Sequence, residues 1–272
     1  MSLCDALRIK SNDIVSFVGA GGKTTATMLI AAELAGRGNS VLVTTTTKIY
    51  EPMPAPDEKL VLAETLDDVL RQLESAFDQA PIMILARRRL DCASESLAWQ
   101  DKGYPIELRS QKLEGILPEW VEPIAGQQQA DMILIEADGA AHRMLKAPAV
   151  HEPVIPECAS LVVPMADVQV LGKALSDEFV HRPTLLADLV SIPLGHPISS
   201  EVFAIALGHE DGGMKGIPAG ARVIPLLTTH DAGYRCVATE KAIRLLLLSP
   251  YVDHIVLAHL RSRPIKWEIF TR

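Results

Sequence analysis

"FVGAGGKTT", residues 17–25, says more about the fold than any other segment of the sequence. Three glycines, a lysine and two threonines follow the apolar run "IVSFVG" (14–19) and precede the amphipathic "ATMLIAAELAG" (26–36). Glycines allow backbone N–H groups to turn inward around phosphate oxygens at the positive end of a helix. A strand, a glycine-rich turn and a helix in this order are the context of a P-loop. The stretch therefore predicts a phosphate-binding loop in an α/β domain.

This loop is shorter than the commonest P-loop. Phe17 stands where that pattern has its first glycine, and Gly19 opens the loop instead, giving G-x-G-G-K-T-T. We expect Lys23 to reach the β- and γ-phosphates and the Thr24 hydroxyl to ligate Mg²⁺, while Thr25 contacts another phosphate or caps the helix. The simpler alternative is a glycine-rich turn that happens to precede Lys and Thr. The residues predicted to bind the nucleotide are Gly19, Ala20, Gly21, Gly22, Lys23, Thr24 and Thr25.

Short apolar runs recur along the chain with helical stretches between them. The runs lie at 14–19, 40–47, 81–87, 131–138, 160–165, 221–229 and 254–260, and the clearest helical stretches at 24–36, 66–77 and 238–248. Continuous apolar runs are typical of parallel strands buried on both faces. The alternation predicts one three-layer α/β domain over residues 1–272, P-loop NTPase-like, with a mostly parallel sheet and helices on both faces.

Two regions fit this scheme less well. Residues 49–60 are proline-rich, and we expect them to form a loop over the strand ends. Residues 87–111 are polar, which favours an excursion or a lid.

"DMILIEADGA" (131–140) supplies acidic partners for the loop. Glu136 and Asp138 follow a buried run, so both carboxylates are expected at the same sheet edge as the loop. One would hold Mg²⁺ and the other would orient a nucleophile or substrate, and the spacing does not say which does which. The alternative, a capping Asp-Gly turn, accounts for Asp138 alone. We predict catalytic roles for Lys23, Glu136 and Asp138, and metal binding by Thr24, Thr47, Glu136 and Asp138.

Further polar residues follow the predicted strands. "TTTTK" places Thr47 and Lys48 beside the loop, although threonine also favours strands for steric reasons. Cations near a transferring phosphoryl group stabilise its charge, whereas a structural turn or a solvated helix start would explain the same residues without a ligand. The residues predicted to bind substrate are Lys48, Arg143, Lys146, His151, Glu152, His181 and Arg182.

The composition limits the partners. The 272 residues carry a formal net charge of -8 with no dense basic block, which argues against nucleic-acid and anionic-membrane binding. The apolar runs fall well short of a membrane span, so we expect a cytoplasmic protein. Four scattered cysteines without a CxxC pair suggest neither zinc nor disulfides. Of the Asn-Lys-x-Asp pattern that reads guanine, the run after residue 225 keeps only Asp231, so ATP is favoured over GTP.

Four segments together carry a resemblance to a known family. "FVGAGGKTT", "VTTTTKI", "LIEADGAAHRMLKAPAVHEPVIP" and "VLGKALSDEFVHRP" resemble the YqeC-like family of selenium cofactor biosynthesis proteins, or selenium-dependent molybdenum hydroxylase accessory proteins. The resemblance implies nucleotide binding and a role in selenium cofactor biosynthesis or in hydroxylase maturation. It also implies a molybdenum hydroxylase or another maturation protein as partner. It does not define the small-molecule acceptor.

Three activities remain open from the sequence. The loop spacing also looks like that of Mur ligases, which implies an ATP-dependent ligase or small-molecule kinase as one alternative. A maturation NTPase stimulated by a protein partner is the second, and a non-hydrolysing nucleotide-binding accessory protein is the third.

Overall fold

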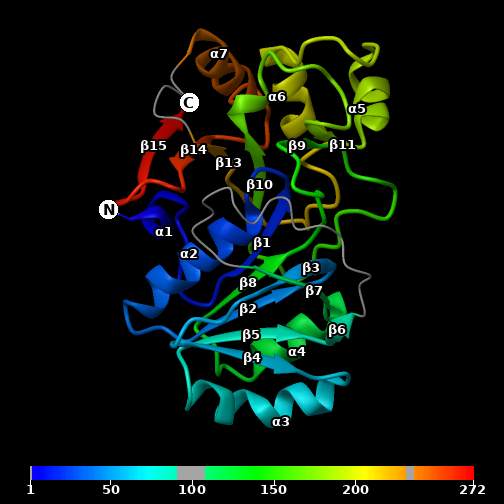
Figure 1. The fold of residues 1–272 in the computed structure, drawn as a ribbon. Helices are drawn as coiled ribbons and strands as arrows, with labels where there is room; N and C mark the ends of the chain where they lie inside the picture. The colour runs from blue at the N-terminus through cyan, green and yellow to red at the C-terminus, as the bar shows by residue number, and fades with distance from the viewer. Residues whose placement is uncertain (1, 91–107, 231–235) are drawn as a thin grey trace.

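The protein is an α/β structure built on one large sheet (Figure 1). The computed structural model describes residues 2–90, 108–230 and 236–272. The sheet order is β15-β14-β13-β10-β1-β8-β2-β5-β4, with β12 beside β10, and every pairing is parallel except that of β15 with β14. The strands are β1 (Ile14–Gly19), β2 (Val41–Thr45), β4 (Glu58–Leu62), β5 (Ile82–Ala86), β8 (Met132–Glu136), β10 (Leu161–Asp167), β12 (Arg222–Val223), β13 (Leu226–Thr229), β14 (His254–His259) and β15 (Lys266–Thr271).

Helices cover both faces of this sheet. One face carries α1 (Leu3–Ala6) and α2 (Lys23–Ala35); the other carries α3 (Leu66–Phe77), α4 (Val121–Gly126), α5 (Pro183–Val190), α6 (Ser200–Gly208) and α7 (Val237–Leu246). Alternation within β1 shows the two faces, because Phe17 packs in the cluster that includes α2 and Val18 in the cluster that includes α3. The predicted three-layer fold class is confirmed.

A second, smaller sheet lies outside the main one. It has the order β3-β7-β6 and consists of β3 (Lys48–Pro52), β6 (Arg88–Leu90) and β7 (Leu108–Glu114), all antiparallel. The expectation of a loop over 49–60 was wrong, since this segment contributes to β3 and β4 with its prolines at or between the strand ends. Of the excursion predicted over 87–111, residues 91–107 lie outside the described ranges.

Gly115 lies where the small sheet closely approaches the main sheet, in backbone contact with Thr45 and Thr47. Gly115 donates its N–H to the Thr47 carbonyl at 2.7 Å, and a Cβ on Gly115 would lie 2.3 Å from the carbonyl oxygen of Thr45. Any side chain at this position would push β7 away from the end of β2. The small sheet is therefore held against the carboxyl edge of the main sheet.

The register brings the ends of five strands, β1, β8, β10, β13 and β14, to that edge. Phe17 pairs with Glu136, Asp167 with Thr228, and Thr229 with His259. Ligands of parallel α/β sheets bind outside this edge. A short parallel pair, β9 (Leu145–Lys146) and β11 (Val180–His181), lies nearby, and the two 3₁₀ turns are η1 (Pro118–Trp120) and η2 (Val168–Val170). No helix within the described ranges is long and apolar enough to cross a membrane.

Candidate functional site

The glycine loop, residues 19–25, is packed tightly against the end of β10. Gly19 and Gly21 have φ angles of +91° and +81°, and added Cβ atoms would lie 2.4 Å from the Met165 carbonyl oxygen and 2.5 Å from the Asp167 nitrogen. Phe17 is fully buried inside β1. The position that is often glycine therefore belongs to the core here, and the shortened loop begins at the end of the strand.

Protein acceptors bind the first N–H groups of the loop. Gly19 donates to Asp138 Oδ2 at 2.9 Å, Ala20 to the Met165 carbonyl at 2.9 Å, and Gly21 to the Arg143 carbonyl at 3.2 Å. Ala20 is fully buried, which gives it no surface toward a ligand. The part of the loop suited to an anion is thus the N-terminus of α2 behind Gly22, where the first N–H groups lack intrahelical partners and the helix dipole is positive.

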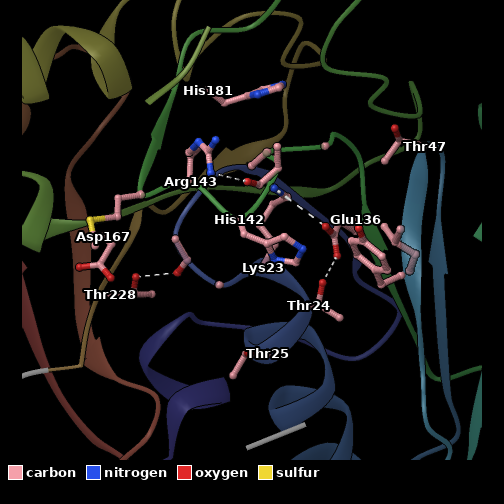
Figure 2. A pocket seen from close by; sticks show the side chains of 18 of the residues that line it. Lys23, Thr24, Thr25, Thr47, Glu136, His142, Arg143, Asp167, His181 and Thr228 are labelled. Atoms are coloured by element: carbon pink, nitrogen blue, oxygen red, sulfur yellow. Dashed lines mark hydrogen bonds and ion pairs between the residues drawn. The ribbon is translucent and has the colours of Figure 1, made fainter. Parts of the chain in front are cut away.

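Lys23 and Thr24 both contact the carboxylates that follow β8. Lys23 Nζ donates to the Gly19 carbonyl at 2.6 Å and lies 3.1 Å from Asp138 Oδ1 and 3.9 Å from Glu136 Oε1. Thr24 Oγ1 donates to Glu136 Oε2 at 2.8 Å, and Figure 2 shows this pair beside Lys23. The prediction that both carboxylates would lie near the loop agrees with this geometry.

Asp138 begins a chain of buried charges that runs away from the loop. Lys146 Nζ lies 2.9 Å from Asp138 Oδ2 and 2.9 Å from Glu152 Oε2, and it also donates to the Gly139 carbonyl at 2.6 Å. Arg182 contacts both carboxylate oxygens of Glu152. Lys23, Asp138, Lys146, Glu152 and Arg182 therefore alternate in sign, so that each buried charge has an opposite neighbour.

Burial and charge shift three pKa values at this edge. Burial raises the pKa of Glu136, more than Lys23 and the Thr24 hydroxyl lower it. Burial also acts to raise the pKa of Glu152, but the hydrogen bonds from Arg182 and Lys146 outweigh it and lower this pKa to about 2. Burial, with the charges of Arg182 and Lys146, lowers the pKa of His181 to about 4. Glu152 is thus ionised and His181 neutral at pH 7.

The strand ends and the small sheet enclose a cavity of about 450 Å³ above α2. Twelve predicted site residues line it: Gly21, Gly22, Lys23, Thr24, Thr25, Thr47, Lys48, Glu136, Arg143, Glu152, His181 and Arg182. Gly19, Asp138 and Lys146 lie behind the loop, where they line a separate space of about 20 Å³. His151 is exposed and is not part of either lining. Thr25 is in the first turn of α2, whose N-cap is Gly22, so Thr25 does not cap the helix.

Two walls of the cavity were not predicted from the sequence. Tyr50 on β3 stacks on His142 with ring centroids 5.2 Å apart, and the Lys112 ammonium lies 4.9 Å from the Tyr50 ring centre. At the opposite side, Thr228 donates to the Gly21 carbonyl at 2.6 Å, and Asp167 Oδ2 lies 3.2 Å from His230 Nδ1. Asp167 could have been found, because it follows a buried strand just as Glu136 does.

The donor set suits a hard cation that is shared with phosphate oxygens. Among the described residues no group of three or more His, Cys, Asp and Glu side chains is arranged to hold a metal. Thr24 Oγ1 and Glu136 supply two oxygen donors next to the anion-binding helix end. Mg²⁺ commonly takes one or two protein ligands together with phosphates and water, so these residues fit it.

The comparison with known proteins agrees with the sequence resemblance. A model of the family described as YqeC protein matches residues 15–184. The chain belongs to the YqeC family. A relative from Escherichia coli (strain K12), described as uncharacterized protein YqeC, is 28% identical over 247 residues, which is 91% of this chain and 86% of that protein. The YqeC match contains every residue predicted for the site. The cavity-lining residues at the end of β13 and directly after β14 lie beyond the match.

Proposed function

We propose that this YqeC family member binds a Mg²⁺-nucleotide, ATP before GTP, in the cavity above α2. It would transfer or hydrolyse the γ-phosphate in selenium cofactor biosynthesis or in the maturation of selenium-dependent molybdenum hydroxylases. One observation carries the nucleotide part: Lys23 and Thr24, at the start of α2, already contact Glu136 and Asp138 beneath a 450 Å³ cavity. The selenium part rests on the family resemblance.

Each residue of the loop has a role in this proposal. The N–H groups at the start of α2 bind phosphate oxygens, and Lys23 stabilises charge on the γ-phosphate. Thr24 and Glu136 hold Mg²⁺, which when bound supplies positive charge to the phosphate oxygens. Asp138 has a different role, since its side chain is 2% exposed and is paired with Lys23 and Lys146; it positions the lysine. Lys48, Arg143 and Arg182 are left to bind an acceptor.

The cationic cavity favours a small-molecule kinase or ligase among the three activities. Such an enzyme hydrolyses ATP slowly alone and much faster with its acceptor. A maturation NTPase would respond to a protein partner instead, and a non-hydrolysing accessory protein to neither. ATP turnover with candidate acceptors or with a molybdenum hydroxylase distinguishes the three.

The nucleotide part is tested by thermal unfolding with ATP, GTP or CTP and Mg²⁺. We expect ATP to raise the midpoint of the wild type and to have little effect on Lys23→Ala. Lys241→Ala is a matched control, because Lys241 is exposed on α7 and pairs with Glu201 on α6. If no nucleotide stabilises the wild type, the proposal fails; if ATP stabilises both wild type and Lys23→Ala equally, the role of Lys23 is wrong.

The selenium part needs a cellular test. A strain lacking this gene is complemented with wild type or with Lys23→Ala, and the activity and selenium content of a selenium-dependent molybdenum hydroxylase are measured. We expect only the wild type to restore both. Normal hydroxylase activity and selenium content in the uncomplemented strain would refute the role in selenium cofactor biosynthesis or hydroxylase maturation. The proposal of nucleotide binding would be unaffected.

A further inference from the structure

We propose that the cavity contains a second oxyanion subsite, formed by Lys48, Arg143 and Arg182, that binds a small molecule bearing a carboxylate or phosphate group. As the acceptor site of the phosphoryl transfer, it rests on the proposed function. As an anion-binding site, it has evidence of its own.

The charge of the cavity is opposite to that of the protein. Among the described lining residues, six lysines and arginines face three carboxylates, whereas the whole chain carries a formal net charge of -8. The cations are Lys23, Lys48, Lys112, Arg143, Arg182 and Arg261, and the carboxylates are Glu136, Asp167 and Glu152. A cavity with this excess attracts anions and raises their local concentration.

Two of these cations form no ion pair among the described residues, Lys48 and Arg143. The charge of Lys48 does lower the pKa of Glu114, its neighbour across β3 and β7, while the Arg143 guanidinium donates to the carbonyl of Ala141 at 3.3 Å. Lys23 and Arg182, in contrast, are paired with Asp138 and Glu152. Cations that share a cavity repel one another, and a bound oxyanion relieves this repulsion through charge-assisted hydrogen bonds.

The three residues come from different elements and line the same cavity. Lys48 begins β3, Arg143 follows the turn after β8, and Arg182 is the N-cap of α5. Figure 2 shows Arg143 and His181 on the side of the cavity away from Thr25 and the body of α2. An anion there would lie beside the phosphate-binding helix end, not on it.

The pKa of the neighbouring His181 is also shifted by the charges on this side of the cavity. His181 is held neutral at pH 7 because burial and the charges of Arg182 and Lys146 lower its pKa to about 4. The carboxylates of Glu152 and Asp138 act in the opposite direction on this pKa but are outweighed. The two nearby cations therefore act on His181 more strongly than the two carboxylates do, in addition to the effect of burial.

The Tyr50 and His142 pair forms a wall of this subsite. The rings are inclined by 29° with centroids 5.2 Å apart, so no further ring fits between them. Ala141 and His142 both have positive φ angles, 46° and 57°, which is costly for residues other than glycine and is common beside ligand sites.

An oxyanion acceptor also simplifies the chemistry of transfer. An acceptor oxygen forms a bond to the γ-phosphorus while the bond from phosphorus to the β–γ bridging oxygen breaks, and ADP leaves with that electron pair. A carboxylate or phosphate oxygen carries no proton at pH 7, so the step needs no general base. This fits a site in which Asp138 and Glu152 are occupied by cations.

Citrate and inorganic phosphate, titrated by calorimetry at constant ionic strength, are suitable probes. The proteins are wild type, Lys48→Ala, Arg143→Ala and Arg71→Ala, the last an exposed cation on α3. We expect at least one probe to bind the wild type saturably and about tenfold or more weaker to Lys48→Ala and Arg143→Ala. Binding of that probe to Arg71→Ala should stay within about threefold of wild type.

Two results would overturn the subsite: no saturable binding of either probe, or equal binding by wild type, Lys48→Ala and Arg143→Ala. Citrate and phosphate together separate carboxylate from phosphate recognition. Mg²⁺-ATP is titrated into the same wild-type protein. If ATP does not bind but the probe binds wild type and is weakened in Lys48→Ala and Arg143→Ala, the proposed function alone is refuted. If ATP binds but the probe does not show this difference, the subsite alone is refuted. Circular dichroism of each variant checks its fold.

Discussion

Lys146 is the residue whose loss should damage the buried charge chain most. Its ammonium is 2.9 Å from both Asp138 Oδ2 and Glu152 Oε2, and its side chain is 1% exposed. Lys146→Met keeps the chain length but leaves two carboxylates short of a cation. Breaking a buried pair in this way costs about 3–5 kcal/mol. Since a domain is stable by only about 5–15 kcal/mol, we expect a large fall in the free energy of unfolding.

Urea unfolding at pH 7, followed by far-UV circular dichroism, measures this loss. Lys241→Met is the matched control, because its exposed pair with Glu201 should be worth less than about 1 kcal/mol. In the double variant Lys146→Met with Asp138→Asn, one stranded charge is gone, so the two losses should fall short of additivity by about 0.5–3 kcal/mol. A loss below about 1 kcal/mol for Lys146→Met, or strict additivity in the double variant, would show that Lys146 does not compensate the buried carboxylates in this way.

Three further predictions concern single positions. Glu136→Gln should keep the free energy of unfolding within about 1 kcal/mol, since burial already raises the pKa of this carboxyl, yet lose the Mg²⁺-dependent part of ATP stabilisation in thermal shift. Gly21→Ala should destabilise by more than about 2 kcal/mol in urea, because its Cβ would meet the Asp167 nitrogen, whereas Gly38→Ala, with a similar φ but open space, should cost about 1 kcal/mol; equal losses would contradict this. The pKa of Glu152 is lowered from 4.5 to about 2, so this carboxylate contributes stability that is present above pH 4.5 and lost as the pH falls toward 2. The urea midpoint of Glu152→Gln should therefore fall less over that pH range than the midpoint of the wild type.

Most of the central sheet could be predicted because its strands are buried on both faces. Runs such as those at 132–135 and 161–166 carry no charged or hydrogen-bonding side chain, which local sequence shows directly. The run at 221–229 was one expected strand but is two, β12 and β13, separated at Ile224 and Pro225. Proline removes a backbone donor, so its position in the run was the available signal.

The small sheet could not be predicted in the same way. β3 and β6 are short and partly exposed, and β3 ends at Pro52, so neither burial nor alternation marks these strands. β3 pairs with β7, which is far away in sequence, and that pairing is decided by the contact of Gly115 with Thr45 and Thr47. For the same reason the stack of Tyr50 on His142 has no local signature.

Glu136 and Asp138 show how tertiary contacts separate residues that the sequence leaves equivalent. Both follow the same strand at a spacing of two, yet Glu136 lines the cavity with Thr24 while Asp138 is enclosed by Lys23, Lys146 and the Gly19 N–H. Asp138 thus holds Lys23 in place before any ligand arrives. If Lys23 turned to a phosphate, Asp138 would keep its contacts with Lys146 and Gly19, so its carboxylate would remain compensated. Because Lys146 also compensates Asp138, Lys23 can pair with Asp138 in the absence of a ligand and still turn to a bound phosphate.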